Sequence, residues 1–189
     1  MTINEILVQI YPLQPHLLSV IANCVQEKNI AKGEIILNQN HLAHKLFFIK
    51  KGIVRAYIQT PEKEVTFWFG KEGEPVVSIK SYVMNQRSYE TVEAIEETIV
   101  YELSIKQLHD FYNQHIEIAN WGRKFVEKEL IKTEERLIAL QFQSATERYK
   151  NLLINAPEMI HRIPLSYLAS YLGMTQVSLS RIRAGIKNI

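Results

Sequence analysis

The sequence predicts an α+β protein in which a β-rich half is followed by a helical half. From about residue 31 to residue 103, short β-rich runs alternate with glycine, asparagine and proline, a pattern typical of a sandwich, barrel or roll. After Ser104, hydrophobic residues recur at three- and four-residue spacing, which is the period of an amphipathic helix. The 189 residues have room for one large domain or two small ones.

The composition is that of a globular protein with a hydrophobic core. Hydrophobic residues make up 47% of the chain and charged residues 22%, both ordinary values. The single cysteine, Cys24, cannot form an intrachain disulfide and is expected to be a core thiol. The N-terminus lacks the features of a signal peptide, and no apolar run is long enough to span a bilayer. We therefore expect a cytoplasmic protein.

The same patterns predict the helices and strands of the first 103 residues. Residues 3–30 have helical spacing interrupted at Pro12 and Pro15, and we expect helical structure there. The strands that should form the roll lie within residues 34–40, 45–59, 64–70, 74–79 and 89–103, with Gly33, Gly52, Gly70 and Gly73 at turns.

The helical half begins with a serine cap and a long helix. The stretch "SIKQLHDFY" begins with Ser104, an N-cap that stands before residues with apolar helical spacing. Residues 116–142 then carry a heptad-like stripe of Ala119, Val126, Leu130, Thr133, Leu137 and Leu140, flanked by charged residues. We expect this helix to form a dimer seam, in which Thr133 is the polar interruption. The alternative is that it packs on its own domain.

Residues 144–189 are predicted to form an all-helical module. We expect a helix over residues 145–155, a loop over residues 156–164 that contains two prolines, and two helices on either side of Gly173. Gly173 can adopt the positive φ that ends a helix, and Thr175 can cap the next one. Leu179, Ile182 and Ile186 form one buried stripe of that next helix.

The other face of this last helix is polar and basic. It presents Gln176, Val177, Ser180 and Arg181, with Ser178 and Arg183 at its margins. Residues 151–189 hold four basic residues and one acid, for a net charge of +3. A helix of this kind can read base edges in the major groove, and the alternative is a plain helical hairpin.

In this order, the parts resemble the Crp/Fnr family of bacterial transcription regulators. The resemblance covers nearly all of the chain and rests on "KGEIIL", "FFIKKGIVRAYI", the long helix and "IPLSYLASYLGMTQVSLSRIR". The sequences "SATERYKNLL" and "LSRIR" are most similar to the branch of this family that is common in Bacteroidetes. The strongest matches are the helix-turn-helix segment and the turns at Lys32-Gly33-Glu34 and Lys51-Gly52.

The resemblance implies three parts and their partners. Residues 1–115 would be a sensor domain with a cyclic-nucleotide-binding-like jelly roll, residues 116–143 a dimerisation helix, and residues 144–189 a winged-helix or helix-turn-helix DNA-binding domain. Any wing would lie in "HRIP", residues 161–164. The implied partners are double-stranded DNA, a second copy of the chain and RNA polymerase. The resemblance implies neither membrane association nor enzymatic activity.

The resemblance also implies which residues touch DNA. The family's base-contacting arginine matches Arg181, whereas its Arg-Glu pair at the helix start is replaced by Gln176 and Val177. Because valine cannot accept a hydrogen bond, this departure leaves the target sequence open. The predicted DNA contacts are Thr175, Gln176, Val177, Ser178, Ser180, Arg181 and Arg183.

A ligand site is implied by the same resemblance. In nucleotide-binding members a Gly-Glu pair binds the ribose and an Arg-Ser pair the cyclic phosphate, and these pairs match Gly73-Glu74 and Arg87-Ser88, with Thr133 as the long-helix contact. The ligand would be a cyclic nucleotide or another small effector. Pro75 and a long intervening stretch depart from the pattern, so the alternative is a vestigial pocket with Arg87 on a surface loop.

Two other function classes remain open at this point. His41 and His44 could hold a metal in a cupin-like enzyme, or the chain could be a ligand-binding or interaction module whose helical tail only packs. The sequence contains no Walker A, dinucleotide-binding or paired-carboxylate motif that would indicate an enzyme.

Overall fold

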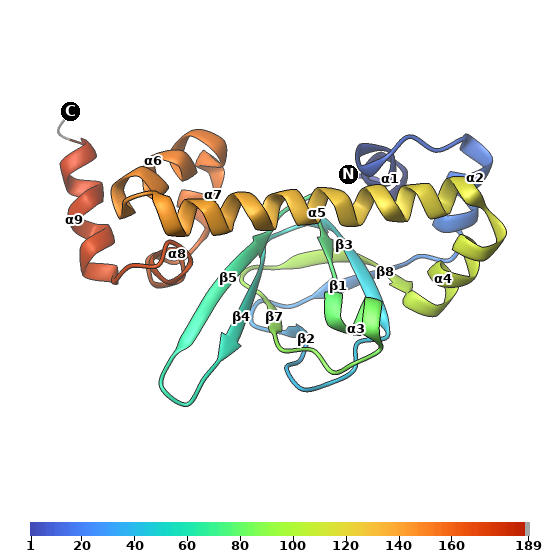
Figure 1. The fold of residues 1–189 in the computed structure, drawn as a ribbon, viewed down its shortest axis with the longest axis horizontal. Helices are drawn as coiled ribbons and strands as arrows, with labels where there is room; N and C mark the ends of the chain where they lie inside the picture. Colours follow the sequence, from blue (N-terminus) through green and yellow to red (C-terminus); the bar gives the residue numbers. More distant parts are fainter. Residues whose placement is uncertain (188–189) are drawn as a thin grey trace.

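The computed structural model describes residues 1–187 and combines a β-roll, a long helix across it and a C-terminal group of helices (Figure 1). The strands form two four-stranded antiparallel sheets, in the orders β1-β8-β3-β6 and β2-β7-β4-β5. Their bounds are β1 (Gln26–Ile30), β2 (Ile35–Leu37), β3 (Lys45–Lys51), β4 (Val54–Gln59), β5 (Glu64–Gly70), β6 (Pro75–Val76), β7 (Thr91–Ala94) and β8 (Thr98–Ser104). The predicted β-roll is therefore confirmed.

The roll is held together by apolar side chains from both sheets. One core cluster contains buried residues of seven strands, among them Ile49, Val54, Val92 and Val100, which are almost completely excluded from solvent. Side chains alternate across a strand, so every second residue of these short runs can face the other sheet. This cluster has no ionisable member. The buried Arg55 of β4 pairs with Glu93 of β7 and Glu64 of β5.

Two expectations for the roll are wrong. Helices α1 (Ile3–Ile10) and α2 (Pro15–Ala22) form as expected, but residues 26–30 are the edge strand β1, which pairs with β8. Four of its five side chains are exposed, so the segment lacks the alternation that would have indicated a strand. In addition, α3 (Ile79–Met84) is a short helix inside a stretch that the sequence analysis treats as strand and irregular chain.

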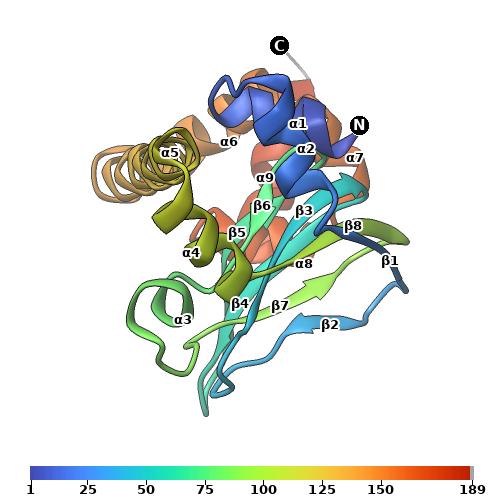
Figure 2. The same ribbon diagram turned by 90° about the vertical axis from the view of Figure 1, so that its right-hand side faces the viewer.

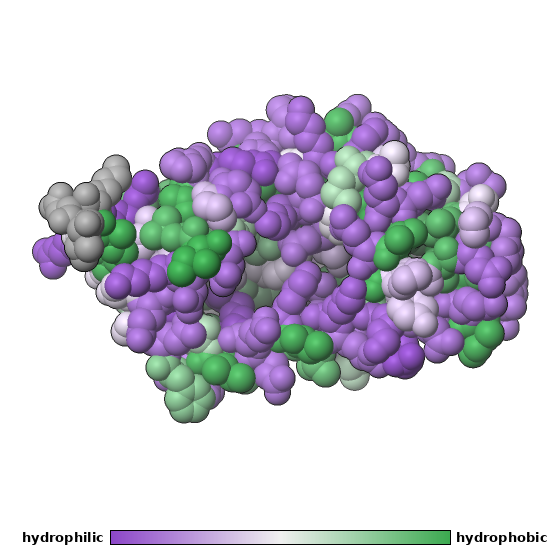
Figure 3. All heavy atoms as spheres, turned by 90° about the horizontal axis from the view of Figure 1, so that it is seen from above, coloured by the Kyte–Doolittle hydropathy of each residue, from purple (hydrophilic) through white to green (hydrophobic). Residues whose placement is uncertain are grey.

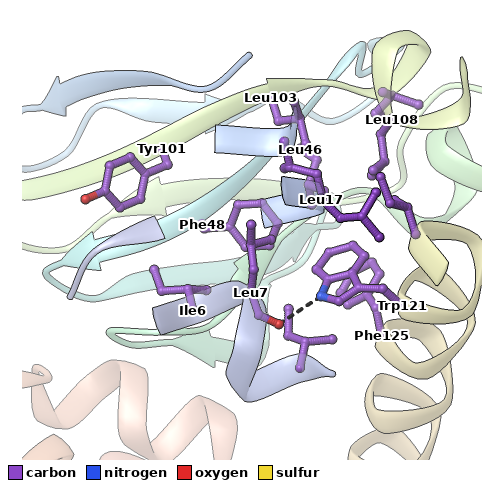
Figure 4. Packing of buried hydrophobic residues seen from close by; sticks show 14 of the residues in the cluster. Ile6, Leu7, Leu17, Leu46, Phe48, Tyr101, Leu103, Leu108, Trp121 and Phe125 are labelled. Atoms are coloured by element: carbon purple, nitrogen blue, oxygen red, sulfur yellow. Dashed lines mark hydrogen bonds between the residues drawn. The ribbon is translucent and has the colours of Figure 1, made fainter. Parts of the chain in front are cut away.

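The first half of the long helix anchors the N-terminal helices to the roll. Helices α4 (Ile105–Gln114) and α5 (Ile116–Phe142) agree with the expected bounds, and Ser104 caps α4 by accepting a hydrogen bond from Gln107 N. Trp121 and Phe125 of α5 are buried against α1, α2 and the sheet (Figure 4). The indole Nε1 of Trp121 donates to Leu7 O at 2.9 Å. Figure 2 shows α1, α2 and α5 on the same side of the roll.

The C-terminal helices lie at the far end of α5 (Figure 1). They are α6 (Ala145–Asn155), α7 (Pro157–Arg162), α8 (Leu165–Tyr171) and α9 (Gln176–Lys187). The expected loop over residues 156–164 is wrong in its middle, because Pro157 starts α7 at a position where its missing N–H costs nothing. Residues 143–187 contain no strand, so "HRIP" does not form a wing.

Among residues 1–187, no helix has the length and apolar character needed to cross a membrane.

Candidate nucleic-acid interface and effector pocket

Helices α8 and α9 form a helix-turn-helix whose turn is made by local chemistry. Gly173 has a φ of +67°, and Met174 N donates to Ala169 O at 3.0 Å across the end of α8. This hydrogen bond is the one that closes a helix at a glycine. Thr175 Oγ1 then accepts from Ser178 N at 3.1 Å and caps α9. Both sequence predictions for the turn are confirmed.

The two faces of α9 differ as expected. Leu179 is completely buried and Ile182 and Ile186 are half-buried. On the other side, Gln176, Val177, Ser180 and Arg181 are exposed, and 60% of the Val177 surface is accessible. Ser178 and Arg183 are half-buried at the margins and Thr175 is exposed. The predicted DNA contacts therefore share the outward side of one short helix and its cap.

Two arginines that the sequence analysis does not single out fix the C-terminal end of α8. Arg136 Nη2 of α5 donates to Tyr171 O at 2.7 Å, and Arg148 Nε of α6 donates to Leu172 O at 2.8 Å. The last carbonyls of a helix lack partners within the helix and are negative ends of its dipole, so cations stabilise them. The end of α8, shortly before α9 begins, is thereby tied to α5 and α6.

The second half of α5 exposes an apolar stripe. Leu130 and Leu137 of the predicted heptad pattern are 66% and 55% exposed, and Leu140 is also exposed. Figure 3, seen from above α5, shows patches of hydrophobic residues on an otherwise hydrophilic surface. Exposed apolar residues in register along one side of a helix are typical of a helix–helix interface.

A cavity of about 250 Å³ lies between the end of α1, the loop that connects β5 to β6, and α5. Gly73 and Glu74 line it, together with Lys132 of α5. Lys132 Nζ contacts Glu74 Oε1 at 3.2 Å and Glu129 Oε1 at 2.9 Å. Burial would lower the pKa of Lys132, but the two carboxylates outweigh it and the pKa is raised. Lys132 is thus a pocket residue that the sequence analysis does not identify.

The remaining predicted ligand residues do not line this cavity. Ser88 is buried, and its hydroxyl donates to Asn38 O at 2.8 Å, while Arg87 is exposed on the loop before β7. Thr133 is exposed and donates to Glu129 O of its own helix. The described hydrogen bonds and ion pairs do not join the Gly73-Glu74 pair to the Arg87-Ser88 pair. The role of these residues in binding a cyclic nucleotide stays a prediction.

The histidines proposed as metal ligands lie beside a second cavity, of about 340 Å³, near Lys45. His41 Nδ1 is 3.0 Å from Gln39 O. Within residues 1–187, no group of three or more histidine, cysteine, aspartate and glutamate side chains is arranged to hold a metal ion. Cys24 is half-buried.

Comparison with known proteins agrees with this fold. Residues 27–115 match the family model of the cyclic nucleotide-binding domain. The chain is similar in structure to FixK2 from Bradyrhizobium japonicum, with a TM-score of 0.77, 19% identity and coverage of 87% of this chain and 85% of that one. No curated protein matches the sequence significantly.

Two further structures are similar over nearly their whole length. A putative transcriptional regulator of the Crp/Fnr family from Eubacterium rectale has a TM-score of 0.73 at 17% identity, covering 95% of this chain and 88% of that one. The c-di-GMP responsive global regulator CLP from Xanthomonas campestris has a TM-score of 0.72 at 15% identity, covering 93% and 92%. The assignment to the Bacteroidetes branch stays a prediction. Residues 27–115 thus match the cyclic nucleotide-binding domain model, in a chain whose fold is similar to that of solved Crp/Fnr regulators over nearly its whole length.

Proposed function

We propose that this protein is a dimeric, sequence-specific DNA-binding transcription regulator of the cytoplasm. The observation that carries the proposal is the exposed polar and basic face of α9, which follows a turn closed at Gly173 and stands on a buried apolar stripe. A cupin-like enzyme is not favoured, because the described histidines lack the further ligands that a metal centre requires.

In this proposal the N-terminal end of α9 enters the major groove. Arg181 donates to the edge of a guanine, and Val177 contacts a thymine methyl group. Gln176 pairs with a base edge or a phosphate, while the hydroxyls of Thr175, Ser178 and Ser180 and the guanidinium of Arg183 bind phosphates and set the register. Neither Arg181 nor Arg183 forms an ion pair with another described side chain, so both cations are available to DNA.

Dimerisation through α5 would give the two reading helices that a two-fold operator needs. Leu130 and Leu137 are exposed, and in the proposed dimer they would meet their copies in the second chain. Half-sites should then lie about one helical turn apart, roughly 10 base pairs from centre to centre. The roll would act as the sensor, with Gly73, Glu74, Arg87, Ser88 and Thr133 as the residues to test for an effector, and RNA polymerase as the partner on DNA.

The test is selection of bound fragments from genomic DNA by the purified full chain, with and without added cyclic nucleotides. We expect enrichment of a two-fold symmetric sequence whose binding weakens steeply with salt, because lysine and arginine displace counterions from DNA. A change of enrichment with one cyclic nucleotide, lost in Arg87→Ala, would assign the effector. Absence of any enriched, salt-sensitive binding would contradict the proposed function.

A further inference from the structure

The helix-turn-helix segment shares its core with the β-roll. Ile53, Phe69 and Ile95 of the roll belong to the same buried cluster as Ile160 and Leu168 of the C-terminal helices. These three roll residues lie where β4 begins, where β5 ends and just after β7, so one end of the roll is covered by α7 and α8. The segment is therefore packed onto the roll rather than linked to it only through α5.

A charged cluster centred on Arg162, the last residue of α7, accompanies this packing. Arg162 Nη1 and Nη2 contact the two oxygens of Glu72 at 3.1 Å and 2.7 Å, and the same guanidinium pairs with Glu96. Glu72 Oε1 also accepts from Gly52 N at 2.8 Å. Glu72 precedes β6, Glu96 precedes β8 and Gly52 precedes β4. One arginine thus joins α7 to three turns of the roll.

The N–H groups along two edges of the Arg162 guanidinium donate to these carboxylates, which leaves little capacity for a DNA phosphate. Paired arginine–carboxylate contacts of this kind are geometrically specific as well as strong. Burial would raise the pKa of the Glu72 carboxyl, but hydrogen bonds from Arg162 and from Gly52 N outweigh it and lower the pKa to about 2. Glu72 is therefore ionised at any physiological pH.

Helix α8 makes its own contacts with strand β5 and its neighbours. Thr66 N donates to Ser170 Oγ at 2.9 Å, and the rings of Phe69 and Tyr171 lie 5.1 Å apart. The buried guanidinium of Arg55 lies 3.6 Å from the ring centre of Tyr167. These contacts and the Arg162 cluster hold the segment in one orientation relative to the roll.

This docking leaves the reading face free. Gln176, Val177 and Arg181 are all exposed while α7 and α8 are packed against the roll. The docked arrangement is thus compatible with DNA binding, and it fixes the position of α9 relative to the roll and α5. If the segment could pivot freely, the two α9 helices of a dimer would adopt many separations. The conformational freedom of the segment would then be lost on DNA binding, which lowers affinity.

We propose that Arg162 is a positioning residue for DNA recognition: it latches the helix-turn-helix segment to its own roll, holds the two α9 helices of a dimer at one separation, and so determines which half-site spacing is accepted. The proposal rests on the proposed function, since it presumes a dimer that reads DNA. It assigns a specificity role to a residue that makes no contact with DNA.

The experiment compares full-length Arg162→Gln and Glu72→Gln/Glu96→Gln with wild type and with Arg123→Gln as the matched control. Arg123 also forms an ion pair, but with Glu127 on the exposed surface of α5. Affinity is measured on duplexes that carry the selected half-sites at the preferred spacing and at spacings one and two base pairs shorter or longer. Hydrogen exchange of residues 157–172 is measured without DNA.

For both latch variants we expect faster exchange in residues 157–172 and weaker binding at the preferred spacing, by roughly tenfold. Binding at the other spacings should change little, so the discrimination between spacings falls, and Arg123→Gln should behave like wild type. The Glu72→Gln/Glu96→Gln variant breaks the same ion pairs from the side of the roll and leaves Arg162 unchanged. If only Arg162→Gln weakens binding, and does so equally at all spacings, Arg162 is a phosphate contact and the proposed latch is wrong.

Two other outcomes also overturn the latch: tighter DNA binding by the latch variants, which would make docking inhibitory, and unchanged discrimination between spacings. Should Arg162→Gln fail to fold, the Glu72→Gln/Glu96→Gln variant alone decides. If wild type shows no sequence-specific binding, it is the proposed function that fails, and the exchange data still report whether Arg162 holds the segment to the roll.

Discussion

At the scale of single residues, Arg181 is the side chain on which reading of one base pair depends. It is exposed on α9 and forms no ion pair with another described side chain. A guanidinium that bonds two acceptors on one guanine discriminates against the other bases, whereas one that bonds phosphate does not. The two roles therefore differ in what a substitution does to specificity.

We expect Arg181→Ala to weaken binding to the preferred operator by about 1–3 kcal/mol and to relax the preference at one position of each half-site. The measurement is a titration against operators that carry every single-base change. Arg123→Ala, which removes an arginine far from α9, serves as the control. Equal weakening for all sequences would identify Arg181 as a phosphate contact.

At the scale of elements, α5 has two halves with different surroundings. Its first half is buried against α1 and α2 through Trp121 and Phe125, and its second half exposes Leu130 and Leu137. A helix that leaves such a stripe in water gains free energy by pairing it, about 2 kcal/mol for each leucine that becomes fully buried. The second half is accordingly the candidate dimer seam.

Leu130→Lys with Leu137→Lys should convert the dimer to a monomer in sedimentation velocity experiments, because each lysine would place a charge inside the seam on both chains. The roll should stay folded, since neither leucine contributes to its core. Ile131→Lys with Ile138→Lys is the matched control, because each of these exposed isoleucines lies about 100° further around the helix. A monomeric wild type, or equal dissociation by both pairs, would refute a narrow seam.

Local chemistry accounts for the elements that could be predicted from the sequence. The caps at Ser104 and Thr175 and the turn at Gly173 depend on neighbours within five residues, and the structure has them as expected. Strand β1 could not be recognised, because an exposed edge strand has no alternation of apolar side chains. Lys132 and Arg162 were equally unpredictable: their partners Glu74 and Glu72 lie 58 and 90 residues away, a separation that only the folded chain closes.

At the scale of the whole molecule, the contact between roll and C-terminal helices should depend on pH through Glu72. The pKa of this carboxyl is about 2 in the docked molecule and 4.5 in its ordinary state. A group with a lowered pKa stabilises the folded state fully above its ordinary value and loses that contribution as pH falls toward the lowered one. The stabilising effect of Glu72 should therefore be constant above pH 6 and decline below about pH 4.5.

We expect the free energy of unfolding of wild type to fall by up to about 2 kcal/mol more than that of Glu72→Gln between pH 6 and pH 3. The comparison with Glu72→Gln removes the contribution of carboxylates that do not contact Arg162, and Glu72→Gln/Glu96→Gln serves as the reference for Glu96, which pairs with the same arginine. Urea unfolding at several pH values provides the measurement. Parallel pH dependence of the two proteins would mean that Arg162 does not stabilise the ionised carboxylate.

The hydrophobic part of that contact bears on how such a chain could be recombined. Because Ile53, Phe69 and Ile95 complete the core of the C-terminal helices, a segment beginning at residue 144 would, if cut free, present to water the apolar side chains that now cover them. Transplanting the reading helix to another sensor would therefore require three matching apolar residues on the recipient's turns. The roll and the C-terminal helices would therefore have to be transferred together. A new binding specificity is more readily obtained by substitutions on the outer face of α9 than by exchange of the C-terminal helices.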